Sequence, residues 1–186
     1  MKKISVLAIA LLSGISVFAQ KYVPKIDAGT QMGYTISMNG EKINFLLNVN
    51  SIADSVKMTW EVSKYGTGTY VMAAKSLEDG KKMFMQAPQP DEVTKLSDAE
   101  TMAFISKTAF KSMAKSQTME FDDLTYTVTK AETSPIKIDN KELDVVHAIS
   151  ADGKNEMWIL NNPDFPLICK TKNGTLGADL TLNYIR

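Results

Sequence analysis

The sequence predicts a mainly β protein of the α+β class, in which a curved antiparallel meander sheet or half-barrel packs on one amphipathic helix. Three observations lead to this prediction. Apolar and polar residues alternate along most of the chain, without a miss over residues 56–63, as in strands with one buried face. Pairs such as Asn39-Gly40 separate these segments at the spacing of hairpin turns. Only residues 97–115 have a helical period instead.

Residues 1–19 have the features of a signal peptide. Two lysines precede an apolar run over residues 4–18, and the expected cleavage lies between Ala19 and Gln20. The run is shorter than the roughly 20 residues of a membrane span, and no second such segment follows, so we expect no membrane span. The remaining residues 20–186 have the length of one domain. We expect this domain to be periplasmic or secreted.

The charge composition argues against a nucleic-acid partner. The chain has 21 basic and 21 acidic residues, and removal of the two leader lysines leaves 19 against 21. Arg186 is the only arginine, so the guanidinium fork that clamps phosphate and carboxylate groups is nearly missing. Cys169 is the only cysteine and therefore has no internal disulfide partner. Its neighbours Leu167 and Ile168 favour a buried, inert thiol.

Strands joined by short turns account for most of the expected domain. The alternation predicts strands at residues 31–38, 42–49, 56–63, 69–74, 81–86, 124–129, 143–149, 156–160, 167–172 and 178–185. The clearest turn signals between them are Asn39-Gly40, Glu78-Asp79-Gly80, Asp152-Gly153 and Asn173-Gly174. Asn173, Gly174 and Thr175 also spell a glycosylation acceptor, but a hairpin explains the same residues more simply.

A helix is expected over residues 97–115. Ser97 and Glu100 have the spacing of a capping box, in which the two side chains satisfy backbone amides at a helix start. The apolar residues that gather on one side of the helical wheel are Met102, Ile105, Ala109, Phe110 and Met113. Lysines line the other side, so we expect the helix to lie across the open face of the sheet. Phe104 projects among the lysines, either as a surface aromatic partly covered by a loop or as a contact for a membrane or partner.

The alternation also specifies which side chains face the interior. The expected inner face contains Val56, Met58, Trp60, Val62, Tyr70, Met72, Met83, Met85, Leu124, Tyr126, Val128, Leu143, Val145, His147, Ile149, Leu167, Cys169, Leu180, Leu182 and Tyr184. The chain has 11 methionines, and methionine is common where varied apolar partners are bound. Such an interior suits either a cavity for a lipid or acyl chain or irregular gap filling in a solid core. For a cavity, the expected ligand-binding residues are Met58, Trp60, Met72, Tyr126 and His147.

Residues 157–167, with the sequence MWILNNPDFPL, are similar to the strand, proline-containing turn and strand near the end of several uncharacterised secreted half-barrels. With the exported single domain and the meander interrupted by a helix, they make the chain resemble the lipoprotein-carrier-like half-barrels of the cell envelope. The resemblance implies an open antiparallel sheet that wraps around helices and holds a lipid. Lipoprotein carriers proper use a buried arginine in lipid handling, and Arg186 is the only arginine here. The resemblance therefore does not extend to the carriage of lipoproteins.

The residue types offer little for catalysis, and we expect no enzyme activity, no cofactor and no metal. His147 is the only histidine, and on a strand Asp144 and Ser150 lie on the face opposite to it. A local triad is thus disfavoured, and a hydrogen-bonded structural histidine is the simpler interpretation. Met83 and Met85 place two thioethers on one strand face, which suits Cu(I), but this spacing arises by chance in a methionine-rich chain.

Two functional hypotheses follow from the sequence. The first is an exported small binding or carrier protein that holds an apolar ligand, a lipid or an acyl chain, between the curved sheet and the helix. The second is a non-enzymatic structural or protein-interaction module of the cell envelope with a solid core. This module would engage an envelope protein through an exposed strand edge or the Phe104 region. Two proline-containing loops, residues 87–92 and 161–166, are either lids of a cavity or rigid connections.

Overall fold

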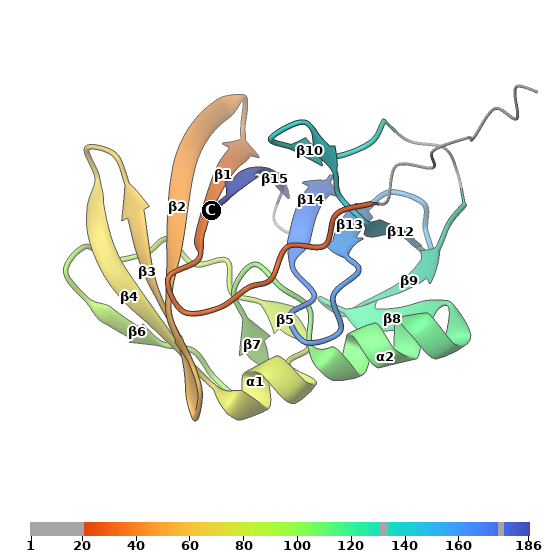
Figure 1. Ribbon diagram of the computed structural model, residues 1–186, viewed down its shortest axis with the longest axis horizontal. Coiled ribbons are helices and arrows are strands. Elements are labelled where there is room, and N and C mark those ends of the chain that lie inside the picture. Colours follow the sequence, from red (N-terminus) through yellow and green to blue (C-terminus); the bar gives the residue numbers. More distant parts are fainter. Residues whose placement is uncertain (1–20, 131–133, 175–176) are drawn as a thin grey trace, which may run out of the picture.

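The computed structural model in Figure 1 describes residues 21–130, 134–174 and 177–186, and one curved sheet dominates it. Within these residues, eleven strands pair in the order β6-β4-β3-β2-β1-β15-β14-β13-β12-β9-β8. Neighbouring strands are antiparallel except β4 and β6, which are parallel. The predicted mainly β class with a curved antiparallel sheet is therefore confirmed. The expected signal peptide, residues 1–19, lies outside the described residues.

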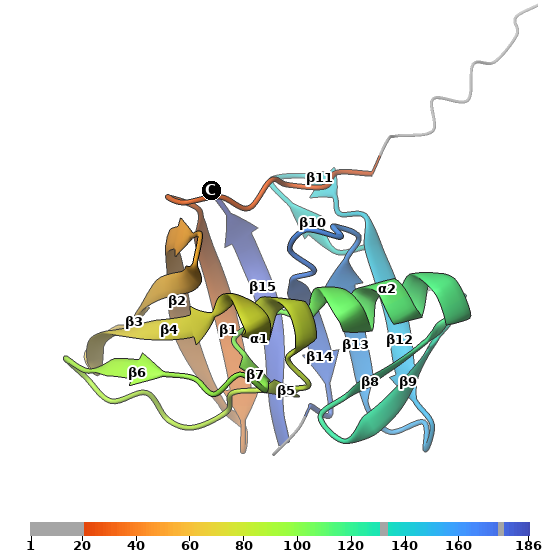
Figure 2. The same ribbon diagram turned by 90° about the horizontal axis from the view of Figure 1, so that it is seen from below.

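Most strand bounds follow the alternation in the sequence closely, but the strands at residues 93–95 and 118–121 were not predicted. The large sheet contains β1 (Gln31–Met38), β2 (Glu41–Ile52), β3 (Ser55–Val62), β4 (Gly66–Ala73), β6 (Val93–Lys95), β8 (Thr118–Phe121), β9 (Leu124–Val128), β12 (Val145–Ser150), β13 (Glu156–Leu160), β14 (Ile168–Lys172) and β15 (Ala178–Ile185). Two short pairs lie outside it: β5 (Lys82–Met83) with β7 (Glu100–Thr101), and β10 (Lys137–Ile138) with β11 (Lys141–Glu142). Helices α1 (Ala74–Asp79) and α2 (Lys107–Ser116) lie in a row across one face of the sheet (Figure 2).

The centre of the sheet joins the two ends of the described fold. Strand β1 pairs with β2 on one side and with β15 on the other. The backbone amides of Gln31 and Arg186 each donate to the carbonyl oxygen of the other residue, at 2.8 and 2.9 Å. At Gly33, an added Cβ would lie 2.2 Å from the ring of Tyr184, so glycine is required where this ring crosses β1.

The first hairpin turn forms as predicted. Asn39 and Gly40 have φ angles of 52° and 83°, the left-handed conformation that the two central residues of a tight hairpin need. Asn173 also has a positive φ of 52°, and its side-chain amide donates to the carbonyl oxygen of Lys154 at 2.9 Å. Thr175, the third residue of the glycosylation acceptor, lies outside the described residues.

The predicted strand over residues 81–86 is wrong in extent. The chain leaves β4 directly into α1, which ends at Gly80, where the backbone amide donates to the carbonyl oxygen of Ser76 at 2.8 Å. Only Lys82–Met83 then pairs as a strand, with β7. Residues 84–90 belong to no strand, and Pro88 and Pro90 in this segment lack the amide that a ladder needs. Backbone pairing with β4 resumes at Asp91, whose amide donates to the carbonyl oxygen of Thr67 at 2.7 Å.

The predicted helix start is also wrong by ten residues. The Ser97 backbone amide and hydroxyl do donate to a carboxylate oxygen of Glu100, at 3.0 and 2.8 Å, but this pair stabilises a turn rather than a helix. Ala103 has a positive φ of 63°, which interrupts any helix through this region. Helix α2 begins instead after Ser106, whose hydroxyl oxygen accepts the amide of Ala109 at 3.3 Å.

Phe104 is fully buried, in contrast to the expectation that it projects among the lysines. It precedes α2, so the helical wheel does not apply to it. A β-bridge pairs it with Leu167, and its ring centroid lies 4.6 Å from that of Phe165. Phe165 is 2% exposed, so the loop of residues 161–166 fills the core instead of presenting an aromatic ring to solvent.

The inner face of β3 and β4 is predicted correctly. Met58, Trp60 and Met72 are each 0% exposed on β3 and β4. Cross-strand partners share a face, and the register pairs Met58 with Tyr70, which is 1% exposed. The inner face of these strands therefore packs as one surface.

The face assigned to β12 is wrong by one residue. Ser150 pairs with the buried Tyr126, and Ala148 pairs with the buried Met157, so Ala148 and Ser150 face inward and His147 faces outward. The inner residues of this strand are small, whereas the outer residues, which include Ile149, are larger. The more apolar set of alternating positions therefore marks the outer face of β12.

Candidate functional site

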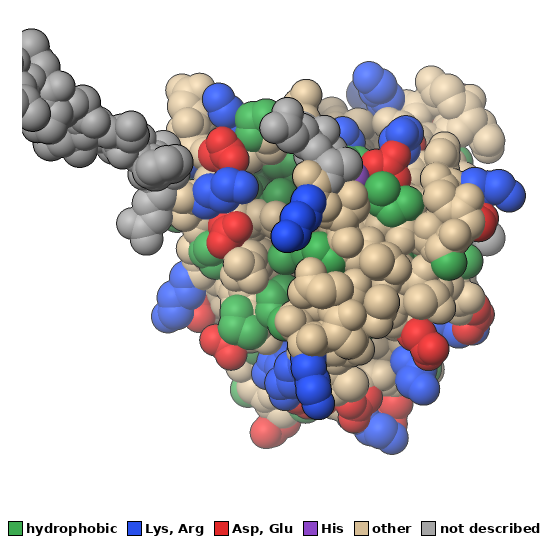
Figure 3. Space-filling model, turned by 90° about the vertical axis from the view of Figure 1, so that its right-hand side faces the viewer, with side chains coloured by type: hydrophobic (Ala, Val, Ile, Leu, Met, Phe, Trp, Pro, Cys, Tyr) green, Lys and Arg blue, Asp and Glu red, His purple; other side chains and the backbone are tan. Residues whose placement is uncertain are grey.

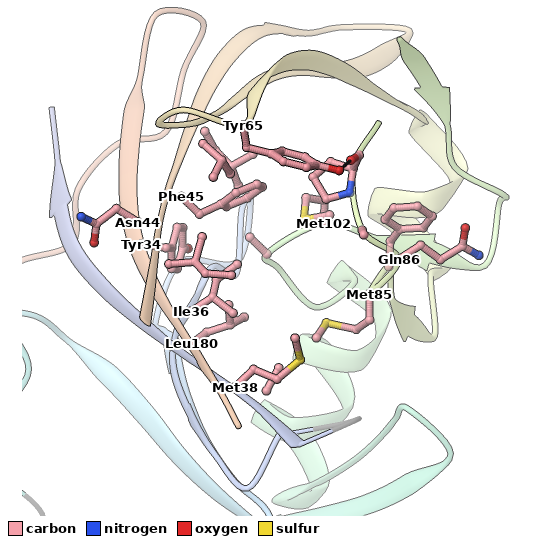
Figure 4. A pocket seen from close by; sticks show the side chains of 18 of the residues that line it. Tyr34, Ile36, Met38, Asn44, Phe45, Tyr65, Met85, Gln86, Met102 and Leu180 are labelled. Atoms are coloured by element: carbon pink, nitrogen blue, oxygen red, sulfur yellow. Dashed lines mark hydrogen bonds between the residues drawn. The ribbon is translucent and has the colours of Figure 1, made fainter. Parts of the chain in front are cut away.

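A pocket of about 900 Å³ lies between the inner face of the sheet and residues 83–88. One wall is formed by β1, β2 and β15 with the β3–β4 turn, and the opposite wall is formed by residues 83–88 and 102–103. Figure 4 shows Tyr34, Ile36 and Phe45 on the sheet side and Met85 on the other. We call residues 83–90 the strap, because this single segment covers the sheet here in place of a helix.

Three hydrogen bonds hold the strap at its two ends. The backbone amide of Met83 donates to a carboxylate oxygen of Asp122, and the amide of Phe84 donates to the carbonyl oxygen of Thr101, both at 2.8 Å. At the other end, the Tyr65 hydroxyl donates to the carbonyl oxygen of Pro88 at 2.8 Å, which is the dashed line in Figure 4. The first two bonds lie deeper in the fold than the Tyr65 bond, which is exposed to solvent.

The deep end of the pocket is aromatic and uncharged. The Tyr34 hydroxyl is satisfied by donating to the carbonyl oxygen of Ile168 at 3.0 Å, and burial raises the pKa of Tyr34 well above its usual value. The ring of Tyr70 meets that of Phe84 edge to face, with centroids 5.6 Å apart, and burial also raises the pKa of Tyr70. Both phenols therefore stay neutral and present their rings to the pocket.

Four methionines line the pocket. They are Met38, Met83, Met85 and Met102. Met38 comes from the end of β1 and Met85 from the strap, and Figure 4 shows their thioether groups pointing toward one another across the pocket. Thioether side chains are flexible and polarisable, so this lining adapts to apolar groups of different shapes.

The rim of the pocket differs from its deep end. Met38 and Tyr65 are 41% and 49% exposed, so the pocket reaches the surface. Its polar and charged lining residues are Lys42, Asn44, Ser63, Lys64 and Gln86, and all five are exposed. The amide groups of Asn44 and Gln86 point away from the pocket in Figure 4. The pocket thus grades from a buried apolar end to an exposed polar rim.

The five residues expected to form a ligand-binding wall do not border this pocket. Met58, Trp60 and Met72 are on the inner face, but they are packed tightly beside the pocket. At Gly68, an added Cβ would lie 2.7 Å from the Trp60 indole nitrogen, so the indole ring fills the space that a side chain would occupy. Tyr126, 2% exposed, belongs to β9 in the other half of the sheet. The two alternatives for the interior thus hold in different places. It is filled around Met58, Trp60 and Met72, and it is hollow beneath β1 and β2, where the pocket extends to Tyr70 of β4.

The pocket residues that the sequence analysis missed lie on the first hairpin. Tyr34, Ile36 and Met38 alternate along β1, and Ile43, Phe45 and Leu47 alternate along β2. The same two-residue period that identified the inner face of β3 identifies these residues. The prolines of residues 87–92 indicated a loop here, but the sequence gives no signal that this loop and the residues before it face the first hairpin.

His147 lies on the outer face in a polar cluster. Its ring stacks on Trp158 with centroids 4.2 Å apart and a 6° angle between planes, and its Nε2 is 2.9 Å from a carboxylate oxygen of Glu156. Lys172 donates to the other carboxylate oxygen of Glu156 at 2.5 Å, and this bond lowers the pKa of Glu156. Ser150 lies on the face opposite to His147, as expected, but this is the inner face, and its hydroxyl donates to Asp152 at 2.6 Å. His147 is hydrogen-bonded, as expected, but on the outer face of the sheet.

Other reactive groups are few in the described part of the chain. Cys169 is 0% exposed, and burial raises the pKa of its thiol to about 12, which confirms the buried thiol. No group of three His, Cys, Asp or Glu side chains in the described ranges could hold a metal ion. Among the same residues, neither helix is long and apolar enough to cross a membrane.

Comparison with known proteins adds no relative. No protein-family description, no curated protein and no solved structure matches this chain.

Proposed function

We propose that this chain is a small binding or carrier protein for an apolar or amphiphilic molecule, and that the ligand occupies the pocket between the first hairpin and the strap. The observation that carries the proposal is the pocket of about 900 Å³ with a largely apolar lining. This volume lies within the roughly 300–1,000 Å³ of small-molecule sites, which are concave and mostly apolar. The proposal keeps the expected class of ligand, but places it against β1, β2 and β15 and the strap rather than against a helix.

The build of the site supports binding rather than catalysis. Phe45 and Leu47 are buried on a strand paired along both edges, so one wall is rigid. The strap opposite is held mainly at its ends, and the methionines on it are adaptable. Among the described residues, no Asp, Glu, His or Cys borders the pocket, so the lining lacks the side chains that most often serve as general acid or base near neutral pH. We therefore propose a ligand-binding protein without enzyme activity.

The alternative, an interaction module with a solid core, receives less support. The Phe104 region that would form its contact surface is buried. Strand β6 remains an edge of the sheet and Val93 on it is 62% exposed, but a single exposed valine is ordinary for a protein surface.

Ligand uptake can be measured with a neutral dye whose fluorescence rises in apolar surroundings, such as Nile red. Octanol, decanol and dodecanol should displace the dye with affinities that rise by about fourfold for each added methylene, because burial of a methylene contributes about 0.8 kcal/mol. Absence of dye uptake and of any dependence on chain length would contradict the proposal.

A matched pair of variants tests the location of the ligand. Ile36→Trp places an indole in the pocket, and we expect it to abolish displacement by dodecanol. Ile52→Trp is the control, because Ile52 is also half-buried on the sheet but does not border the pocket. An equal effect of both variants would remove the pocket from the proposal.

We also propose export to the periplasm or the cell exterior, on the basis of the leader at residues 1–19. Protein isolated from its own envelope and examined by native mass spectrometry should start at Gln20 and retain a bound apolar molecule. A bare mature mass from such a preparation would count against a carrier role.

A further inference from the structure

The polar groups around the pocket carry a charge of one sign. Lys42 and Lys64 border the pocket, and no acidic residue among those that the structure describes does. Neither lysine takes part in an ion pair with another described residue. By contrast, basic and acidic side chains are interspersed on the face of the molecule shown in Figure 3. The charged side chains that border the pocket in the described part of the chain are therefore both cationic, and neither forms an ion pair there.

The two lysines lie close to the exposed apolar part of the rim. Lys64 directly precedes Tyr65 in the β3–β4 turn, and Lys42 directly precedes Ile43, which lines the pocket from β2. The cross-strand partner of Lys42 is Ser37, so its stem leaves the strand on the face opposite to Met38. Both lysines are exposed and have long, flexible stems, so their ammonium groups can approach a group held at the mouth. The deep end holds no charge of its own, since its tyrosines stay neutral.

We infer that the ligand is an amphiphile with an anionic head group, whose apolar chain enters the pocket while the head remains at the rim beside Lys42 and Lys64. This inference rests on the proposed function and names the chemical class of its ligand. The shared chemistry is a carboxylate or phosphate on an aliphatic chain. An ammonium group binds either anion as a point charge, and the rim offers no guanidinium fork to select between them.

Binding of three ligands that share one chain length tests the inference by isothermal titration calorimetry. Dodecanol, dodecanoate and dodecyl phosphate bury the same chain and differ only in the head. Exposed ion pairs contribute modestly, so we expect at least one anion to bind about threefold to tenfold more tightly than the alcohol. The stronger of the two anions distinguishes a fatty acid from a phosphate-bearing lipid as the natural source.

The double variant Lys42→Gln with Lys64→Gln should remove the preference for the anion and leave dodecanol binding unchanged. Its matched control is Lys57→Gln with Lys95→Gln, which removes two exposed lysines that do not border the pocket and should keep the preference. A measurement on the unaltered protein adds a test that needs no variant. Raising the ionic strength from about 0.02 to 0.5 M should weaken binding of the anions but not of the alcohol.

The outcomes separate the inference from the proposed function. Equal affinities for the alcohol and both anions, or a preference that survives in the Lys42 and Lys64 double variant, would overturn the anionic head and leave the apolar pocket intact. Failure of all three ligands to bind would overturn both.

Discussion

Two neighbouring parts of one sheet bury their inner faces in different ways. Beneath β3 and β4, Met58, Trp60 and Met72 are 0% exposed and α1 packs on these strands. Beneath β1 and β2, alternation of the same kind faces the strap, and a pocket of about 900 Å³ remains. A helix supplies side chains from successive turns to the face that it covers, whereas a single unpaired segment supplies far fewer. The cover, more than the strand pattern, determines whether the interior is filled.

Truncation of a methionine is the strongest test of this comparison. Met58→Ala, in the filled part, should lower the free energy of unfolding by about 2–5 kcal/mol, because it leaves a cavity in a packed core. Met85→Ala, at the pocket, should lower it by less than about 1 kcal/mol, since Met85 is only half-buried and already borders empty space. Urea denaturation of both variants measures the difference. Similar losses would mean that the two parts are packed alike.

Addition of volume tests the same contrast from the opposite direction. Gly68→Ala inserts a methyl group 2.7 Å from the Trp60 indole nitrogen and should destabilise the fold by about 1–3 kcal/mol. Ile36→Trp adds many more atoms, but in the direction of the pocket, and should cost less than about 1 kcal/mol. Thermal unfolding of the two variants checks this order, and a larger loss for Ile36→Trp would contradict it.

A substitution on the outer face of the sheet should leave the filled and the hollow parts of the interior intact. It should instead alter how the free energy of unfolding falls at acidic pH. The pKa of Glu156 is lowered by its hydrogen bond from Lys172, so its contribution is present above its ordinary pKa of 4.5 and is lost as the pH falls through the lowered value. Glu156→Gln should cost about 1 kcal/mol near neutral pH and make the loss of stability below pH 4.5 shallower. Urea midpoints from pH 3 to pH 7 measure this. If the urea midpoint fell with pH in the same way in the variant, the pair of Glu156 and Lys172 would contribute nothing to stability.

The smallest expected effect concerns the strap itself. Tyr65→Phe removes the exposed hydrogen bond to Pro88 and should change global stability by about 0.5 kcal/mol or less. Hydrogen exchange of the bonded strap amides, such as that of Phe84, should become about twofold to threefold faster. Tyr22→Phe is the control, because Tyr22 is similarly exposed and lies far from the strap in sequence. Unchanged exchange in Tyr65→Phe would show that this bond does not hold the strap.

Local patterns predicted much of the fold because strands and hairpin turns are determined by near neighbours. The alternation and the Asn39-Gly40 pair placed β1, β2 and β3 almost to the residue. Long-range packing overrode local signals elsewhere. The Ser97 and Glu100 pair has capping spacing, yet the burial of Phe104 against Phe165 moves the helix start to Lys107.

The candidate site was less accessible to sequence reasoning than the fold. The residues of its sheet wall alternate with the two-residue period and could have been predicted from it. The strap has no periodic pattern of apolar residues. On β12 the small residues Ala148 and Ser150 face inward, so the preference of apolar residues for the interior assigned His147 to the wrong side. Periodicity locates faces, whereas an empty space depends on which segment covers them, and that is a long-range property.

The pairing of β1 with β15 has a consequence for the order of folding. Gln31 and Arg186 exchange backbone hydrogen bonds although they lie 155 positions apart in the sequence. Closing so long a loop costs chain entropy before any contact compensates for it, and folds dominated by such contacts form slowly. The hairpin that forms the sheet wall of the pocket therefore keeps one unpaired edge until β15 docks. Competence to bind a ligand should accordingly be among the last properties to appear during refolding.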